Sequence, residues 1–286
     1  MISNVTFSYN IVICSIVKNC AKQLKKNIVF VDELRKYFKS SHVIIYENDS
    51  TDNTKSILES WQKRSNNIIL KFETLKEETI PKESSNGFNK YFSKQRISKM
   101  AYFRNRYMAE LESLNMSIDF VIILDLDVIK IDINGVLNSF ELSNQWDIVT
   151  SNGYSRSPSL KKRYHDSFAL VEIGKENYCQ TEDSILKNQS KWSFLKKGLP
   201  LIPVYSAYGG LAIYKYEFIK GLKYGVVLND DSRVQVRCEH YFLHDEITKK
   251  YGAKIFINPS MIIKYQKIDF ELIIKAIKEK FRLFFK

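Results

Sequence analysis

The sequence predicts an α/β protein built on an open, mostly parallel β-sheet that is flanked by helices. Strand-like and helix-like segments alternate over about residues 8–130, as they do when crossover helices join parallel strands. Acidic side chains follow two of these strands, at the end where ligands of open α/β sheets bind. Because the 286-residue chain shows no repeat and no linker, we expect one domain over residues 1–265 and a separate helix over residues 266–286.

In the first half, short apolar runs predict the strands, and apolar side chains that recur every three or four residues predict the helices. Strands are expected at residues 11–17, 42–46, 68–72 and 120–124. Helices are expected at residues 21–38, 54–64 and 96–113. Asp52 or Asn53 can cap the second helix. The polar segment 73–94 contains Pro81 and Gly87 and is predicted to be a loop.

The second half mixes strands with turns and one clear helix. Strand-like segments occur at residues 146–150, 167–171, 207–214 and 254–258. The third of these begins with a turn at Gly209 and Gly210. A helix is predicted over residues 239–251. The half as a whole therefore extends the sheet with less regular connections than the first half.

Residues 266–286 predict a basic amphipathic helix. Phe270, Ile273, Ile277 and Phe281 fall on one helix face, and lysine and arginine crowd the remainder. Two interpretations stay open. The apolar face packs on the core, or it enters an anionic membrane surface while the basic side chains contact lipid headgroups.

The composition excludes several classes of protein. Apolar residues make up 44% of the chain and aromatic residues 13%, too much for a disordered chain. The four cysteines show no C-x-x-C spacing, so a disulfide scaffold and a zinc site are not expected. No apolar run approaches the ~18 residues of a transmembrane helix, and no signal-peptide pattern is present. We expect a cytoplasmic protein with reduced thiols, either free or peripheral on the cytoplasmic membrane face.

The formal net charge of +12 at pH 7 indicates an anionic partner. Nucleic acid, an acidic membrane and a phosphate-bearing ligand are the three candidate classes. The lysines are dispersed along the chain and no nucleic-acid-binding motif is present, so we expect no nucleic-acid partner.

The strongest chemical signal is a pair of carboxylates, Asp125 and Asp127, directly after an apolar strand. One carboxylate can bind a divalent metal while the other reaches a ribose or a metal-bound water. Mg²⁺ and Mn²⁺ prefer such hard oxygen ligands and share coordination with diphosphates. On the motif alone, a solvated strand end is an equally ordinary interpretation.

Two further segments suit a nucleotide ligand. Residues 47–54, with Glu47 and Asp49, cluster acidic and amide groups where a strand meets a helix, although an ordinary capped loop has the same composition. The helix over residues 96–113 carries Arg104 among several basic side chains, and arginine pairs well with phosphate oxygens. A solvated basic face is the alternative interpretation.

In chain order, these three motifs resemble the nucleotide-sugar half of the GT-A glycosyltransferase fold. The acidic loop, the Phe103-Arg104-Asn105 element and the Asp125-Leu126-Asp127 strand end follow one another as they do there. The Cys238-Glu239-His240 element, with Asn258-Pro259 downstream, looks most like the capsule-associated α-mannosyltransferase family of cryptococcal type. The resemblance covers about residues 10–265. It implies a nucleotide-sugar half over residues 8–130 and an acceptor half over residues 131–265.

The resemblance implies a metal-dependent glycosyltransferase of surface polysaccharide or oligosaccharide synthesis. Its donor substrate would be a nucleotide-diphosphate sugar, its acceptor a glycan or glycolipid, and its cofactor Mn²⁺ or Mg²⁺. Asp127 is then the direct metal ligand, and Asp125 contacts a ribose or a metal-bound water. His244, or alternatively His240, supplies a third metal ligand.

The remaining roles follow from the same resemblance. Glu239 is the catalytic carboxylate, which deprotonates the acceptor in an inverting enzyme or positions it in a retaining one, with a helix-capping role as the alternative. Arg104 contacts the diphosphate or braces the aspartate pair. The nucleotide contacts and the acceptor or sugar contacts are expected at Glu47, Asp49, Gly209, Gly210 and His240.

Two other functions stay open on the sequence. A nucleotidyltransferase can share a similar fold, but the loop after the first strand, residues 17–21, lacks glycine. A catalytically inactive nucleotide-sugar-binding protein would keep the same fold and motifs.

Overall fold

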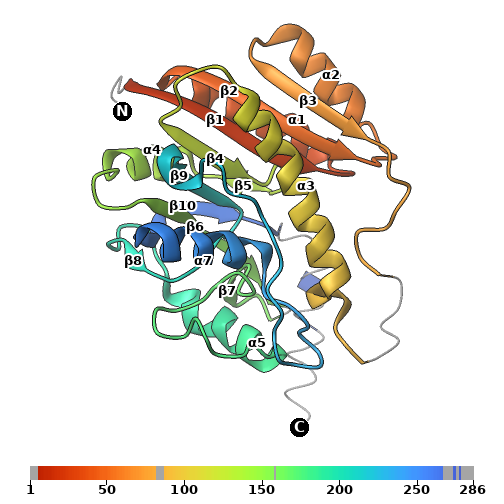
Figure 1. The fold of residues 1–286 in the computed structure, drawn as a ribbon, viewed down its shortest axis with the longest axis vertical. Helices are drawn as coiled ribbons and strands as arrows, with labels where there is room; N and C mark the ends of the chain where they lie inside the picture. The colour runs from red at the N-terminus through yellow and green to blue at the C-terminus, as the bar shows by residue number, and fades with distance from the viewer. Residues whose placement is uncertain (1–5, 82–86, 158, 267–272, 275–276, 278–286) are drawn as a thin grey trace.

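The protein was analysed as a computed structural model that describes residues 6–81, 87–157, 159–266, 273–274 and 277. Within these residues, ten strands form one sheet with the order β3-β2-β1-β4-β9-β6-β10-β5, while β7 pairs with β6 and β8 with β10 (Figure 1). The predicted open, mostly parallel α/β sheet is therefore confirmed. The predicted helix over residues 266–286 falls almost entirely outside the described residues.

The part of the sheet that the first 124 residues form is parallel throughout. Its strands are β1 (Phe7–Val17), β2 (Phe38–Asn48), β3 (Ile68–Glu73) and β4 (Phe120–Leu124). β1 pairs in parallel with both β2 and β4, and β2 pairs in parallel with β3. Their carboxyl ends consequently lie at one edge of the sheet, which is where polar side chains can meet a ligand.

The remaining strands are connected to β4 through one strand that runs antiparallel to it. They are β5 (Lys130–Ile131), β6 (Ile148–Arg156), β7 (Lys162–Tyr164), β8 (Ile202–Pro203), β9 (Leu211–Lys215) and β10 (Ile255–Lys264). β9 lies antiparallel between β4 and β6, and β10 runs parallel to β6. This arrangement brings the end of β10 close to the end of β4 across the sheet.

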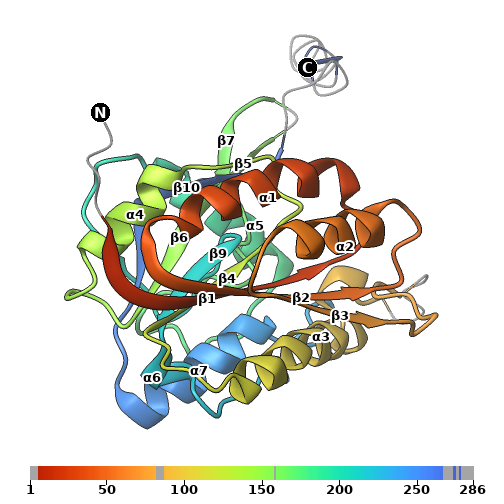
Figure 2. The ribbon, with the colours of Figure 1, turned by 90° about the horizontal axis from the view of Figure 1, so that it is seen from above.

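Helices cover both faces of the sheet (Figure 2). They are α1 (Ala21–Arg35), α2 (Thr54–Arg64), α3 (Lys94–Ser113), α4 (Ile133–Glu141), α5 (Glu182–Lys191), α6 (Tyr216–Ile219) and α7 (Glu239–Tyr251), with short 3₁₀ turns η1 (Lys90–Phe92) and η2 (Trp192–Phe194). α1, α2 and α4 lie on one face, and α3 and α7 lie on the other. Two apolar cores result, one on each face.

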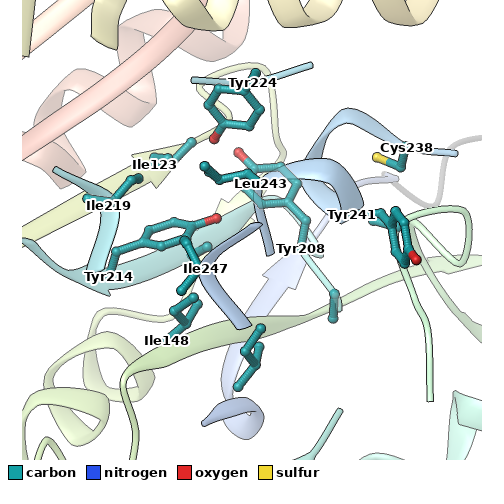
Figure 3. Close-up of a cluster of buried hydrophobic side chains, with 14 of the residues drawn as sticks. Ile123, Ile148, Tyr208, Tyr214, Ile219, Tyr224, Cys238, Tyr241, Leu243 and Ile247 are labelled. Atoms are coloured by element: carbon teal, nitrogen blue, oxygen red, sulfur yellow. The ribbon is translucent and has the colours of Figure 1, made fainter. Parts of the chain in front are cut away.

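The core beneath α3 and α7 is unusually rich in tyrosine (Figure 3). Tyr208, Tyr214 and Tyr224 are buried there among aliphatic side chains such as Leu243 and Ile247. Buried phenol groups need hydrogen-bond partners, so this core supplies polar hydroxyls beside the edge of the sheet. The same tyrosines that fill this core can therefore also donate hydrogen bonds at the edge of the sheet.

The structure differs from the sequence prediction in a few elements. Residues 167–171 do not form a strand: they begin with a turn, and only Val171 bridges to Ser206. Their apolar side chains are nevertheless buried, and an apolar run without periodicity does not specify a strand. The first helix ends at Arg35, because Phe38 already starts β2. The helices α4, α5 and α6 were not predicted.

Among the described residues, no helix combines the length and the apolar character that crossing a membrane requires.

Candidate functional site

A cavity of about 330 Å³ lies at the carboxyl ends of β1, β2 and β4. Side chains of α3 and the first residues of α7 form its opposite wall. The segments after β7 and after β10 close the remaining sides, through Asp166 and Tyr265. The cavity therefore lies where the topology of the sheet predicts a ligand site.

Asp125 and Asp127 line this cavity from the turn that follows β4. Asp125 is half-buried and Asp127 is exposed to the cavity. The turn is held from α1, because the buried Asn27 amide donates to the carbonyl oxygens of Leu126 and Val128, at 2.8 Å each. Burial and the neighbouring charge of Asp127 raise the pKa of Asp125 to about 6.

Two tyrosine hydroxyls hold the carboxylate of Asp125. Tyr208 donates to Oδ1 at 2.7 Å, and Tyr265 donates to Oδ2 at 2.9 Å. The ring of Tyr265 stacks on His165, with 3.6 Å between ring centroids. Both oxygens of Asp125 are thus oriented by residues far away in the sequence, whereas Asp127 remains open to a ligand.

Gly209 and Gly210, which were expected to contact the sugar or the acceptor, lie outside the cavity. Gly209 and Gly210 have φ values of 70° and 96°, which favour glycine, and neither lines the cavity. A Cβ at Gly210 would lie 2.1 Å from the Tyr265 hydroxyl oxygen, and one at Gly209 would lie 2.4 Å from the Ser151 carbonyl oxygen. The pair therefore makes room for Tyr265 and for the neighbouring strand.

Arg104 lines the cavity, but among the described residues its guanidinium forms no ion pair with Asp125 or Asp127. Its Nε donates to Oε1 of Glu239 at 2.9 Å, and both side chains are buried. Burial by itself would raise the pKa of Glu239, but the charges of Arg104 and Arg96 lower it. The charge of Arg104 is thus paired with Glu239 rather than with the aspartate pair, and its contact with a diphosphate stays a prediction.

Two further cations line the cavity beside Arg104. Lys18, directly after β1, and Arg96, in the first turn of α3, both line the cavity. One Arg96 nitrogen donates to the Tyr91 carbonyl oxygen at 2.9 Å, which fixes the direction of the side chain. These two residues are the cavity-lining cations without a carboxylate partner among the described residues.

His244 lies away from the cavity and does not fit the role of metal ligand. It is fully buried, with Nδ1 3.0 Å from the Ser206 hydroxyl and Nε2 2.9 Å from the Tyr214 hydroxyl. Burial lowers its pKa to about 3, so the ring is neutral. Both nitrogens are occupied by the protein, and neither is available to a cation.

His240, one helical turn before His244, does line the cavity. Its ring stacks on Tyr208 with 3.8 Å between centroids, and the side chain is 1% exposed. Neither ring nitrogen has a hydrogen-bond partner among the described residues. Unpaired buried nitrogens are rare, so His240 is placed to receive a polar group of a ligand.

The acidic loop after β2 is held by hydrogen bonds within the loop and to the segment after β3. Glu47 is fully buried and accepts a hydrogen bond from the Ser50 amide at 2.7 Å, while Asp49 accepts from the Leu75 and Lys76 amides at 2.9 and 3.1 Å. Neither residue lines the cavity. The structure instead places Asn48, the last residue of β2, on the cavity wall.

At the start of α2, the residue at the N-cap position is not the residue whose side chain caps the helix. Asn53 is the N-cap but makes no side-chain cap bond. The carboxylate of Asp52 accepts from the Thr54 amide and hydroxyl, at 3.0 and 2.6 Å. The Ala21 amide donates to the same carboxylate at 3.1 Å, so the loop is held both by internal bonds and by the first residue of α1.

Asp166 was not singled out by the sequence, although it lines the cavity together with the aspartate pair and Glu239. It follows β7 and has φ of 61°, a left-handed conformation that aspartate tolerates better than most residues. No motif marks it, since its neighbours Arg163, Tyr164 and Ser167 form no recognisable pattern. The adjacent His165, one of four histidines in the chain, was the one available signal.

Comparison with known proteins agrees with the family that the motifs resemble. The family model described as cryptococcal mannosyltransferase 1 matches residues 10–246. No curated protein sequence gives a significant match.

Several solved structures are similar in fold. The mannosyltransferase PcManGT from Pyrobaculum calidifontis, in complex with GDP-Man and Mn²⁺, matches with 14% identity and a TM-score of 0.49, over 97% of this chain and 65% of that one. TarS 1–349 from S. aureus matches with 13% identity and a TM-score of 0.44, over 90% and 60% of the two chains. Glucosyl-3-phosphoglycerate synthase from M. tuberculosis matches with 11% identity and a TM-score of 0.45, over 94% and 77%.

The chain thus spans less than two thirds of the first two of these proteins. At this level of similarity, the three structures bear on neither the substrate nor the mechanism of this chain.

Proposed function

The chain belongs to the cryptococcal mannosyltransferase 1 family, and from this premise we propose that it is a metal-dependent glycosyltransferase. It would move a sugar from a nucleotide-diphosphate sugar to a glycan or glycolipid acceptor in surface polysaccharide synthesis. The observation that carries the proposal is one cavity that collects Asp125 and Asp127 with Lys18 and Arg96. Carboxylates and cations side by side suit a diphosphate bound together with a divalent cation.

The donor atoms at the aspartate pair fit Mn²⁺ or Mg²⁺. Both cations prefer hard oxygen ligands and complete their coordination with water and substrate phosphates. Among the described residues, no group of three or more His, Cys, Asp or Glu side chains could hold a metal ion. That is consistent with a cation that takes its remaining oxygens from the diphosphate. When bound, it would offset the diphosphate charge and stabilise the leaving nucleoside diphosphate.

The protein's own side chains can then be given roles. Asp127, which is open to the cavity, would hold the cation, and Asp125, which two tyrosines orient, would contact a ribose hydroxyl or a metal-bound water. Lys18 and Arg96 would contact the diphosphate oxygens. Asn48 would contact the ribose or base from the end of β2. The acceptor would enter on the side of His240.

The proposed acceptor is also consistent with the charge of the chain. A net charge of +12 is larger than the binding of one diphosphate requires. The remaining basic side chains would be attracted to an anionic membrane that carries a glycolipid acceptor.

Release of nucleoside diphosphate from a panel of GDP- and UDP-sugars, with and without Mn²⁺, tests the proposal. GDP-mannose comes first because of the family. We expect turnover that requires the cation and that falls at least a hundredfold in Asp127→Ala. Asp183→Ala, on the exposed first turn of α5, is the matched control and should remain active.

Two results would contradict the proposal. Absence of turnover with every donor, while nucleotide binding persists, would indicate an inactive binding protein of the same fold. Equal turnover in wild type and Asp127→Ala would remove the aspartate pair from the mechanism.

A further inference from the structure

A second cavity, of about 380 Å³, adjoins two of the segments that form the cavity of the aspartate pair. Arg237 lines the second cavity, and Glu239, two residues further on, lines the first. In the same way, Phe168 lines the first cavity and Leu170 the second. The two cavities are therefore neighbours on the side where His240 was proposed to meet the acceptor.

The second cavity is positively charged. Its lining contains four cations and one carboxylate, namely Lys175, Lys187, Lys191 and Arg237 with Glu172. Lys175 and Lys191 both pair with the one carboxylate, whereas Lys187 and Arg237 form no ion pair among the described residues. The surplus of positive charge favours an anionic ligand in this cavity.

Arg237 is the cation whose surroundings most require an anion, because its side chain is only 4% exposed. Its terminal nitrogens donate to the carbonyl oxygens of Tyr178 and Glu176, at 2.6 and 3.1 Å. The guanidinium carbon lies 4.4 Å from the centre of the Tyr241 ring. These contacts orient the guanidinium, but they supply no full negative charge. Since buried cations are normally paired, the described residues leave Arg237 without the counter-charge that it requires.

Nearby carboxylates are engaged elsewhere. Asp245 is paired with Lys249 at 2.7 Å and accepts the Tyr205 hydroxyl at 2.6 Å. Glu176 contacts Arg237 through its carbonyl oxygen, and among the described residues its carboxylate forms no ion pair with the guanidinium. It lines a different cavity, on the side of β8 and β10. The charge of Arg237 is thus left for a group that enters the second cavity.

Neutral polar side chains of the second cavity suit a saccharide. Asn188 lines it from α5, and Tyr178, which is 66% exposed, offers an aromatic ring. Gln180 is 7% exposed, and its amide nitrogen donates to the carbonyl oxygens of Phe168 and Leu170, at 3.2 and 3.4 Å. Its Oε1 has no partner among the described residues. A sugar hydroxyl both donates and accepts hydrogen bonds, so it can use groups of this kind.

We propose that the second cavity binds the anionic group, a carboxylate or a phosphate, of an acidic acceptor saccharide. This rests on the glycosyltransferase function proposed above. The anion pairs with Arg237 and Lys187, and the sugar hydroxyls bind the neutral side chains. Because the two cavities are neighbours, the hydroxyl that accepts the transferred sugar then reaches the cavity of the aspartate pair.

Calorimetric titration of the full chain with four probes tests the proposal. The probes are glucuronic acid, mannose 6-phosphate, mannose and inorganic phosphate. We expect both acidic sugars to bind at least about tenfold more tightly than mannose, which lacks the charge, and than phosphate, which lacks the hydroxyls. Saturation with GDP and Mn²⁺ should change these affinities by no more than about twofold, because the nucleotide binds in the other cavity.

Lys187→Glu is the main variant, because Lys187 is exposed on α5 and its replacement does not disturb the core. The affinity for both acidic sugars should fall at least about tenfold. Lys63→Glu, on the exposed face of α2, is the matched control and should bind both sugars as the wild type does. Arg237→Met should weaken binding as Lys187→Glu does, and thermal unfolding checks that each variant is folded.

The proposal is overturned if neither acidic sugar binds below about 10 mM, or if Lys187→Glu and Lys63→Glu bind them equally. It is also overturned if phosphate binds as tightly as the acidic sugars, since the cavity would then hold a free anion. Displacement of the acidic sugars by GDP and Mn²⁺ would place them in the first cavity and would overturn it as well. These measurements require no turnover. A wild type that binds acidic sugars but turns over no nucleotide sugar would overturn the glycosyltransferase function and leave the anion site in place.

Discussion

Arg104 and Glu239 form an ion pair inside the protein, with 2.9 Å between Nε and Oε1. The pair joins α3 to the first residue of α7 at the wall of the cavity. The faces of Tyr208 and Tyr224 lie 5.2 and 5.6 Å from the guanidinium carbon. The charges are therefore enclosed by aromatic rings, where each depends on the other for its stabilisation.

Breaking this pair from one side should destabilise the protein strongly. Arg104→Met leaves the Glu239 carboxylate buried without a counter-charge, which we expect to lower the free energy of unfolding by about 3–5 kcal/mol. Urea unfolding of the wild type, the single variants and Arg104→Met/Glu239→Gln measures the coupling. The double variant should recover part of the loss. Purely additive single losses would contradict a coupled pair.

The amide of Asn27 should matter for both stability and activity. Asn27→Leu, of similar volume, leaves the carbonyl oxygens of Leu126 and Val128 without their donor. We expect a loss of about 2–3 kcal/mol in unfolding free energy. The turn with Asp125 and Asp127 would shift, and metal-dependent turnover should fall as well. Lys26→Leu, on the exposed face of the same helix, is the control and should change neither quantity by much. Equal behaviour of the two variants would contradict the prediction.

A methyl group at Gly210 should disturb the orientation of Asp125. Gly210→Ala would place Cβ within 2.1 Å of the Tyr265 hydroxyl, so the tyrosine must move away from the carboxylate. We expect turnover to drop about a hundredfold, as displacements near 1 Å can cause. Gly174→Ala is the matched control, because its φ is 81° and no atom lies within 4 Å of its Cβ position. It carries the same backbone strain without the clash and should stay active.

Stability should decrease as the pH falls below about 6.5. Burial lowers the pKa of His244 to about 3 in the folded chain, against about 6.5 in the unfolded chain. Above pH 6.5 the His244 ring is neutral in both the folded and the unfolded chain, so its pKa difference does not change the free energy of unfolding. Between 6.5 and 3 the unfolded chain binds a proton that the folded chain does not, which costs about 1.4 kcal/mol for each pH unit.

Urea unfolding at pH 7.5 and 5.5 measures this dependence. His244→Gln should reduce the decrease by about 1.4 kcal/mol between these pH values, because one titrating group is removed. The pKa values of His165 and His240 are lowered as well, and those of Asp125 and Asp166 are raised and act in the opposite direction, so some pH dependence should remain. An unchanged decrease in His244→Gln would show that this histidine is not the group that titrates.

The sequence by itself determined the parallel first part of the sheet and one end of the site. Residues 120–124 were predicted as a strand and form β4, and the helix over residues 239–251 was predicted within its observed bounds. The position of Asp125 and Asp127 on the cavity followed from that strand, since side chains that follow a parallel strand face the ligand edge. The family, too, was predicted from the order of such local motifs.

Only the tertiary structure decided which side chains meet. Arg104 pairs with Glu239, Tyr265 holds Asp125, His244 is enclosed by two hydroxyls, and Asp166 enters the cavity from the segment after β7. Spacing along a chain specifies neighbours within one helix or strand. Contacts between elements depend on how those elements pack and on the rotamers that the packed core allows. The spacing of residues along the sequence specifies neither of these.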